Sequence, residues 1–384
     1  MTLIANDQVL AWAEQIRPHL TQTVESILAA GRELIAAKEA LPHGQFGPLL
    51  DALGLSADMA QRFMRIANNP VLANAARVQG LPASISTLDE LTRWEPEELA
   101  EAIDSGEVTP ATTRAEAQAG RTYLTLVTHE GTKVQYPKPK APAKFNESTG
   151  DGISWASWSW NPVTGCLHAC EYCYAREIAT SPRYAESYPA GFTPLFHHER
   201  LAAPATTTIP AAHQHDPAYR RVFVCSMADL YGKWVPDEWI SAVHESMLAT
   251  PEWEYLLLTK FPSRYAKVEL PPNAWVGTSV DEQRRVPIAE EAFRKIDGVK
   301  VKWLSLEPLR TPLQFSDLSM FDWVVIGAQT GTNQPTGRVD AFAPDFGWVS
   351  DIYQQAREAG CRVHFKPNLL RNPGMRMPDE YPDL

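Results

Sequence analysis

The chain has 384 residues, of which 44% are hydrophobic and 21% are charged, a composition ordinary for a globular protein that is long enough for two domains. Its formal net charge of −11 argues against a broadly basic, nucleic-acid-wrapping surface, although a local basic cleft remains compatible with it. Long apolar runs and a secretory signal are both absent, so we expect no membrane span and a cytoplasmic location.

Residues 1–120 are predicted to form a small helical domain. Within it, Gly54 is predicted to end one short helix and Ser56 to be the N-cap of the next. Two short helices joined by such a turn resemble a helix-turn-helix. The second helix would then present Gln61, Arg62 and Arg65 to DNA. The alternative is a plain helical bundle with solvated arginines, because these 120 residues hold 8 Lys and Arg against 16 Asp and Glu. Both interpretations stay open.

Residues 121–150 are rich in Pro, Lys and Gly and are predicted to be a linker. From 151 to 384, apolar strand-like runs alternate with amphipathic helices, which favours a parallel sheet. The predicted strands are 221–227, 254–260, 274–280, 301–307, 322–328 and 361–367, and the clearest helices are 236–251, 282–296 and 346–360. These patterns suit a full or partial (β/α) barrel, with an open doubly wound sheet as the rival.

Each predicted strand of this region finishes in small or polar residues. In a (β/α) barrel the C-terminal ends of the strands meet at one mouth, where chemistry takes place. Six polar strand ends together favour a site there. The residues concerned are Ser226, Asp229, Thr259, Lys260, Thr278, Ser279, Ser305, Glu307, Gln329, Thr330 and Lys366.

Three of the five cysteines, Cys166, Cys170 and Cys173, lie in one short loop after a candidate strand. Clustering of this kind favours metal or catalytic use in a reducing compartment over disulfides. Zinc would need a fourth ligand, such as His168 or Cys225. A catalytic thiol would leave two cysteines unexplained, and a [4Fe–4S] cluster held by three cysteines would keep one iron open for a small ligand.

The Cys-x3-Cys-x2-Cys spacing, with the aromatic Tyr172 just before the last cysteine, resembles the signature of radical S-adenosylmethionine (SAM) enzymes. More closely, most of residues 153–370 resembles the phage Gp37/Gp68-like proteins, through runs such as "WNPVTGC", "RVFVCSMADLY", "LLLTKFPSR", "AWVGTSVD" and "DWVVIGAQTG". Members of that family space the first two cysteines more widely, whereas this chain has the standard radical SAM interval. Residues 1–120 separately resemble a helical domain of unknown function common on phages and plasmids.

The resemblance implies a partial (β/α)6 barrel of radical SAM type preceded by a small all-α domain. It implies that the three cysteines ligate a [4Fe–4S] cluster whose fourth iron binds SAM. An electron from a donor such as flavodoxin or ferredoxin then cleaves SAM to methionine and a 5′-deoxyadenosyl radical, which abstracts a hydrogen atom from a substrate.

The resemblance also suggests roles for residues around the mouth. Tyr172 would pack near adenine, and Ser226 with Asp229 would meet the SAM amino group. Ser279 and Glu307 would meet SAM or the substrate, and Gln329 lies between glycines that allow close approach of a ligand.

Five further residues have predicted roles or positions. Lys260 and Lys366 would either pair with Glu307 or bind substrate phosphate. Cys225 would donate a hydrogen atom to a product radical, although a buried small side chain is the favoured alternative. His168 is predicted to face solvent, and Cys361 to lie in the core.

Three functions follow from these observations. The first is a radical SAM enzyme acting on a nucleic acid or nucleotide, with SAM and DNA as partners. The second is a non-catalytic DNA-binding regulator with a structural or redox-sensing metal. The third is radical modification of a peptide or small metabolite.

Overall fold

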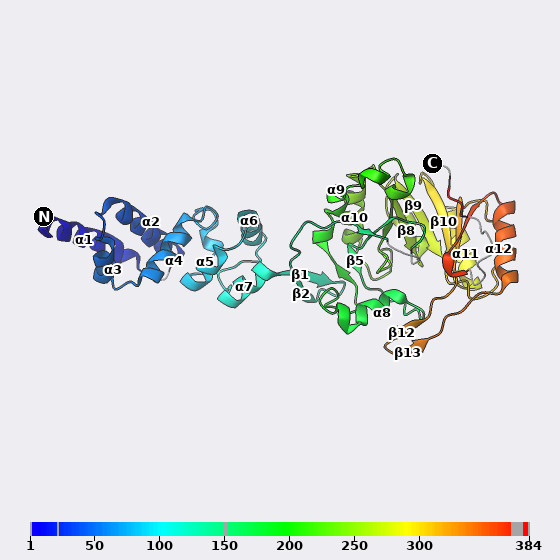
Figure 1. The fold of residues 1–384 in the computed structure, drawn as a ribbon, viewed down its shortest axis with the longest axis horizontal. Helices are drawn as coiled ribbons and strands as arrows, with labels where there is room; N and C mark the ends of the chain where they lie inside the picture. The colour runs from blue at the N-terminus through cyan, green and yellow to red at the C-terminus, as the bar shows by residue number, and fades with distance from the viewer. Residues whose placement is uncertain (1, 21–22, 149–152, 370–378, 383–384) are drawn as a thin grey trace. The chain divides into compact units, whose positions relative to one another are not determined.

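The computed structural model describes residues 2–20, 23–148, 153–369 and 379–382. The chain divides into two compact units, Met1–Leu124 and Thr125–Leu384, coloured blue to cyan and cyan to red in Figure 1. Each unit has its own hydrophobic core. No helix among the described residues is both long and apolar enough to cross a membrane.

The first unit is helical, as predicted. Gly54 takes the left-handed conformation that ends α3, with φ 68°, and the Ser56 side chain accepts a hydrogen bond from Met59 N in the first turn of α4. Close packing of α2 on α4 requires Gly31, because a Cβ atom there would lie 2.3 Å from the Phe63 carbonyl oxygen. The helices are α1 (Thr2–Ile16), α2 (Val24–Ala40), α3 (Phe46–Leu53), α4 (Ala57–Asn68), α5 (Ile85–Leu91), α6 (Pro96–Asp104) and α7 (Arg114–Thr122).

The second unit is built on an eight-stranded sheet whose strand order follows the chain. Its edge strand β3 is antiparallel to β4, and the remaining neighbours are parallel. A doubly wound sheet would reverse its order at a switch point, so this order favours the predicted barrel type. The strands are β3 (Asn146–Glu147), β4 (Trp158–Trp160), β7 (Arg221–Val224), β8 (Glu254–Thr259), β9 (Ala274–Ser279), β10 (Val301–Leu306), β11 (Trp323–Ile326) and β14 (Arg362–Phe365).

The two faces of this sheet bury different residues, as the two-residue period of strands requires. One face packs against α10 (Asp237–Leu248), α11 (Val286–Phe293) and α12 (Phe346–Glu358), which match the three predicted helices. The other face is a separate tryptophan-rich cluster, as expected for the filled interior of a partial barrel. That cluster contains Trp155, Ala156, Phe223, Leu256, Trp275, Val301, Trp303, Trp323 and Val325. The predicted α/β class and the preceding helical unit are therefore confirmed.

Residues 121–150, expected to be a linker, carry strands where the structure describes them. β1 (Tyr123–Thr128) pairs with β2 (Lys133–Pro137) and with β6 (Leu195–Phe196), and β6 pairs in turn with β5 (Val163–Thr164). This small sheet and β3 tie the segment to the second unit. The unit also contains α8 (Tyr174–Thr180), α9 (Ala203–Thr206), and a hairpin of β12 (Thr332–Gln334) and β13 (Gly337–Val339).

Candidate functional site

The cysteine loop, defined here as residues 165–173, runs from the end of β5 to the start of α8. Gly165 has φ 85°, and a Cβ atom at this position would lie 2.3 Å from the Thr193 carbonyl oxygen, so only glycine fits. Gly165 N donates to Met227 O at 2.9 Å, and Cys166 N donates to Phe192 O at 3.1 Å. The loop therefore begins directly beside the chain that leaves β7.

The far end of the cysteine loop is fixed by α8. Cys173 is the N-cap of this helix, and its Sγ accepts a hydrogen bond from Arg176 N at 3.4 Å. The Arg176 guanidinium donates to Cys170 O at 3.0 Å. Ala169 takes a positive φ of 56°, an uncommon conformation for a residue with a side chain, and such residues cluster at functional sites.

The three loop cysteines are half-buried and form no disulfide. Burial raises the pKa of the Cys166 thiol, and the charges of Asp229, Cys173 and Cys170 raise it further. Burial likewise raises the pKa of the Cys173 thiol, again with a contribution from Cys170. A bound cationic centre would counter these effects and favour the thiolate forms of both cysteines.

As a donor set, three clustered thiols fit an iron–sulfur cluster. Within the part of the chain that the structure describes, however, no group of three or more His, Cys, Asp or Glu side chains is already gathered around one point as a metal ion requires. A multi-iron cluster does not require such a gathering, because each of its cysteines ligates a different iron.

Asp229 joins the cysteine loop to the ends of β7 and β8. Its Oδ2 lies 2.6 Å from His168 Nε2 and accepts a hydrogen bond from Lys260 N at 2.9 Å, while Oδ1 accepts from Tyr231 N at 3.1 Å. The prediction that His168 faces solvent is wrong. Its side chain is 9% exposed and packs against the rings of Trp234 and Phe261.

A second polar cluster joins Tyr172 to the ends of β8 and β9. Lys260 Nζ lies 2.9 Å from Asp281 Oδ2 and 3.1 Å from the Tyr172 hydroxyl, and that hydroxyl also donates to Asp281. Arg285 approaches the other carboxylate oxygen at 2.8 Å. Burial alone would raise the pKa of Asp281, but Lys260 and the hydrogen bonds from Tyr172 and Lys260 lower it to about 2. Burial and Asp281 raise the pKa of the Tyr172 phenol.

A third pair lies at the ends of β10 and β14, where Lys366 Nζ donates to Glu307 Oε1. Lys366 is thus the partner of the strand-end glutamate, and Lys260 belongs to Asp281. Gly327 makes room for this pair, because a Cβ atom there would come within 2.9 Å of the Glu307 side chain and 3.1 Å of Lys366.

The remaining predicted cofactor residues lie at strand ends with different surroundings. The Ser226 hydroxyl exchanges hydrogen bonds with the Asn161 side chain, and its carbonyl accepts from Tyr174 of α8 at 2.6 Å. Ser279 is a buried last residue of β9. Gln329 is 8% exposed and donates to Asp340 O at 2.8 Å, which leaves its amide oxygen without a partner.

Cys225 does not face the mouth. It is 3% exposed within the cluster that the helices cover, and burial raises the pKa of its thiol to about 12. The position of Cys225 therefore does not support its predicted role as a hydrogen-atom donor. It agrees better with the alternative, a small buried side chain. Cys361 is also buried, as predicted, with its thiol donating to Phe321 O at 3.1 Å.

Sequence reasoning missed Asp281 and Asn161. Asp281 stands two residues past β9, so the strand-end pattern that singled out its neighbours could have found it. Asn161 directly follows β4, and its side chain accepts from Met227 N at 2.9 Å. A polar residue after a short strand is a weak signal by itself.

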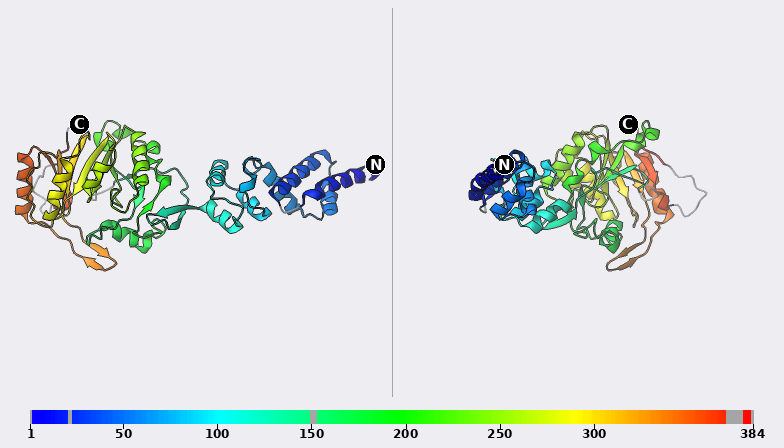
Figure 2. Two further views of the ribbon diagram at one scale, coloured as in Figure 1. Left: turned by 180° about the vertical axis from the view of Figure 1, so that it is seen from behind. Right: turned by 60° about the vertical axis from the view of Figure 1, so that its left-hand side comes forward.

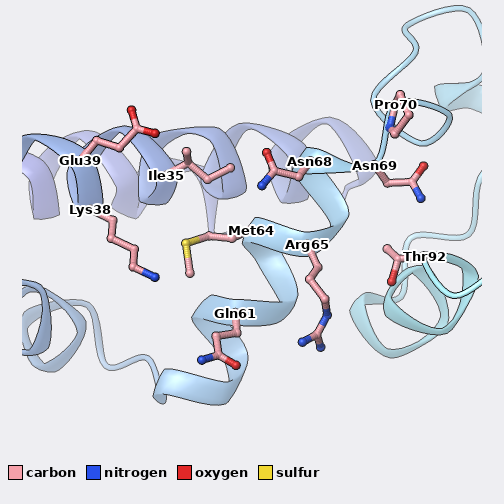
Figure 3. Close-up of a pocket in the computed structure, with 10 residues that line it drawn as sticks. All are labelled: Ile35, Lys38, Glu39, Gln61, Met64, Arg65, Asn68, Asn69, Pro70 and Thr92. Atoms are coloured by element: carbon pink, nitrogen blue, oxygen red, sulfur yellow. The ribbon is translucent and has the colours of Figure 1, made fainter.

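The first unit holds a separate pocket of about 660 Å³ between α2 and α4 (Figure 3). Of the predicted DNA-contacting residues, Gln61 and Arg65 line it. Arg65 is not a free cation, since it makes hydrogen bonds of 3.0 and 2.7 Å to the buried Asp89, and Arg62 approaches the same carboxylate at 3.9 Å. The lining residues are Ile35, Lys38, Glu39, Gln61, Met64, Arg65, Asn68, Asn69, Pro70 and Thr92.

Comparison with known proteins gives one family and one solved structure. No curated protein matches the chain. A structure described as "Spore photoproduct lyase complexed with dinucleoside spore photoproduct" superimposes with a TM-score of 0.38 and 12% identity, over 59% of this chain and 80% of that chain. The family model described as "Protein of unknown function (DUF5131)" matches residues 150–368, more than half of the chain. The chain therefore belongs to this family, the Gp37/Gp68-like phage protein family that its motifs indicated.

Proposed function

We propose that the chain is a radical SAM enzyme that holds a [4Fe–4S] cluster through Cys166, Cys170 and Cys173 and acts on a nucleic acid or nucleotide. One observation carries the proposal: three unpaired thiols share a loop that is fastened to the carboxyl ends of parallel strands. When bound, such a cluster with SAM supplies a 5′-deoxyadenosyl radical that removes a hydrogen atom from a substrate.

The chain's own residues orient and enclose this site. Asp229 holds the His168 turn of the loop on β7, and Lys260 with Asp281 holds Tyr172 at the neighbouring strand ends. Ser226, Ser279, Glu307 and Gln329 supply further polar groups around the mouth. A purely structural metal needs no such lining, which favours an enzyme.

The nucleic-acid part of the proposal is supported by the α3–α4 geometry, in which a three-residue turn with Gly54 precedes a well-capped helix. The same geometry also favours a second candidate, a non-catalytic DNA-binding regulator with a structural or redox-sensing metal centre. The pairing of Arg65 and Arg62 with Asp89 reduces the cationic charge that either role would use.

Anaerobic reconstitution tests the chemistry. The protein should take up iron and sulfide, turn brown, and, once reduced, convert SAM to 5′-deoxyadenosine. Cys170→Ala should abolish cluster uptake and SAM cleavage. Cys361→Ala, which changes a buried cysteine outside the loop, should retain both activities. A colourless, zinc-loaded wild-type protein that leaves SAM intact would contradict the proposal.

The substrate class is tested separately by SAM cleavage with and without added DNA. Binding of a fluorescent oligonucleotide to the full chain, measured over a range of salt concentrations, shows whether phosphate contacts contribute. DNA binding without any SAM cleavage would favour the regulator. SAM cleavage without DNA binding at low salt would favour a peptide or metabolite substrate.

A further inference from the structure

The hairpin β12–β13 leaves the main sheet after β11 and lies beside α8, at the lower edge of the second unit in Figure 1. The views in Figure 2 show the same neighbouring arrangement. The hairpin takes no part in the sheet, since its strands pair only with each other. Pairing with the main sheet therefore does not explain why the hairpin lies against α8.

Gln334, the last residue of β12, reaches the third cysteine. Its Nε2 donates to Cys173 O at 2.8 Å and to Thr332 Oγ1 at 3.0 Å. The orientation of the amide follows from chemistry, because a backbone carbonyl only accepts and so must face the nitrogen. Gln334 is 7% exposed, and its amide oxygen has no partner. The side chain's polar contacts are thus made by its nitrogen alone.

The neighbouring Asn333 makes a second, weaker tie. Its Nδ2 donates to Glu177 Oε1 at 3.0 Å, but both groups are exposed. Glu177 N in turn donates to Cys173 O at 3.3 Å, as the first turn of α8 closes. Two residues of β12 therefore hold the turn that begins at Cys173. The hydrogen bond of Gln334 is partly buried, and that of Asn333 is exposed.

The three cysteines are consequently held by three different parts of the unit. Cys166 N bonds Phe192 O, Cys170 O accepts from Arg176, and Cys173 O accepts from Gln334. Of these partners, Gln334 is the most distant along the chain from its cysteine, by 161 residues. This contact therefore ties the end of the cysteine loop to the part of the chain that follows β11.

We propose that Gln334 is a positioning residue that holds Cys173 in place for metal binding, with the β12–β13 hairpin as its support. The metal-binding part of this inference rests on the proposed function. The holding of Cys173 does not, and it can be measured in the metal-free chain.

Gln334→Met tests the inference, because methionine keeps the length and volume of the side chain but removes the donor. In the metal-free full chain, alkylation of each cysteine by iodoacetamide is followed by peptide mass spectrometry. Loss of one buried hydrogen bond should raise the rate at Cys173 roughly tenfold. Cys166 should keep its wild-type rate, and Asn333→Ala, which removes only the exposed tie, should change Cys173 much less.

An unchanged rate at Cys173 would overturn the inference. So would an equal rise at Cys166, Cys225 and Cys361, because general loosening would then explain the result. If the methionine variant does not fold, Gln334→Asn retains an amide that is too short to reach Cys173 and gives the same test. In reconstituted protein, Gln334→Met should alter the electron paramagnetic resonance spectrum of the reduced cluster while Asn333→Ala leaves it unchanged. A wild-type chain that takes up no iron would defeat the proposed function and leave the alkylation test intact.

Discussion

His168 and Asp229 join the cysteine loop to the end of β7 through a single side-chain contact, with Nε2 2.6 Å from Oδ2. The same carboxylate accepts backbone hydrogen bonds from Lys260 and Tyr231. Asp229 is therefore a junction between three segments that the chain brings together only on folding.

Asp229→Asn should loosen this junction, because an amide group presents N–H donors to neighbours that are themselves donors. We expect a loss of about 3 kcal/mol in the free energy of unfolding, measured by urea denaturation. Asp237→Asn is the control, since that carboxylate is 82% exposed and its substitution should have little effect. Equal losses in both variants would show that Asp229 has no special role.

Asp281 should make the second unit sensitive to acid. Its pKa of about 2 in the folded chain lies below the ordinary value of 3.8, so the carboxylate stabilises the fold above pH 4. That stabilisation, about 2 kcal/mol, should be lost as the pH falls from 4 to 2. Asp281→Asn should therefore show a flatter decline in stability over this interval than the wild type.

The control for the acid experiment is Asp297→Asn, which alters a 94% exposed carboxylate that lies 3.7 Å from Lys302. Its stability should decline between pH 4 and 2 as steeply as that of the wild type. A parallel decline in Asp281→Asn would contradict the prediction.

Gly165→Ala should dismantle the start of the cysteine loop. The substitution combines a positive φ with a Cβ atom placed 2.3 Å from Thr193 O, and we expect a loss of roughly 3 kcal/mol or more. Gly360→Ala is a matched control, because Gly360 has a similar φ of 83° and nothing within 4 Å of the added atom. Thermal unfolding and iron uptake should both be impaired in Gly165→Ala, with smaller losses of stability and normal iron uptake in Gly360→Ala.

Asp89→Asn should destabilise the first unit by about 3 kcal/mol. The substitution removes the buried carboxylate that Arg65 contacts through two nitrogens and that Arg62 approaches. Asp104→Asn breaks a comparable two-nitrogen contact with Arg77 at an exposed position and should cost much less. Stronger DNA binding by Asp89→Asn would further show that Asp89 restrains these arginines.

Much of the second unit could be predicted from the sequence because its signals are local. Runs such as "DWVVIGA" are apolar on both faces, as a strand buried on both sides requires, and polar residues follow at the end. Lys260, Glu307 and Lys366 were found in this way, and the structure places them in ion pairs at strand ends.

The contacts that assemble the site could not be predicted, because they join residues far apart along the chain. Tyr172 and Asp281 are separated by 109 residues, and His168 and Asp229 by 61. The strands within 121–150 were not predicted for a similar reason. The proline and lysine content of this segment is typical of a linker, whereas its strands are stabilised by pairing with β6 and β4. The sequence of α4 likewise did not indicate that Arg62 and Arg65 contact the buried Asp89 of α5.

The tryptophan cluster inside the sheet provides a built-in optical probe. Four of the chain's twelve indoles, Trp155, Trp275, Trp303 and Trp323, form tilted and edge-to-face pairs there, with the centroids of the contacting rings 5.1 to 6.4 Å apart. Rings held this close in a fixed, chiral arrangement couple their electronic transitions, so the second unit should have a strong near-ultraviolet circular dichroism signature. Unfolding of this unit can then be followed without a label and without a bound cofactor.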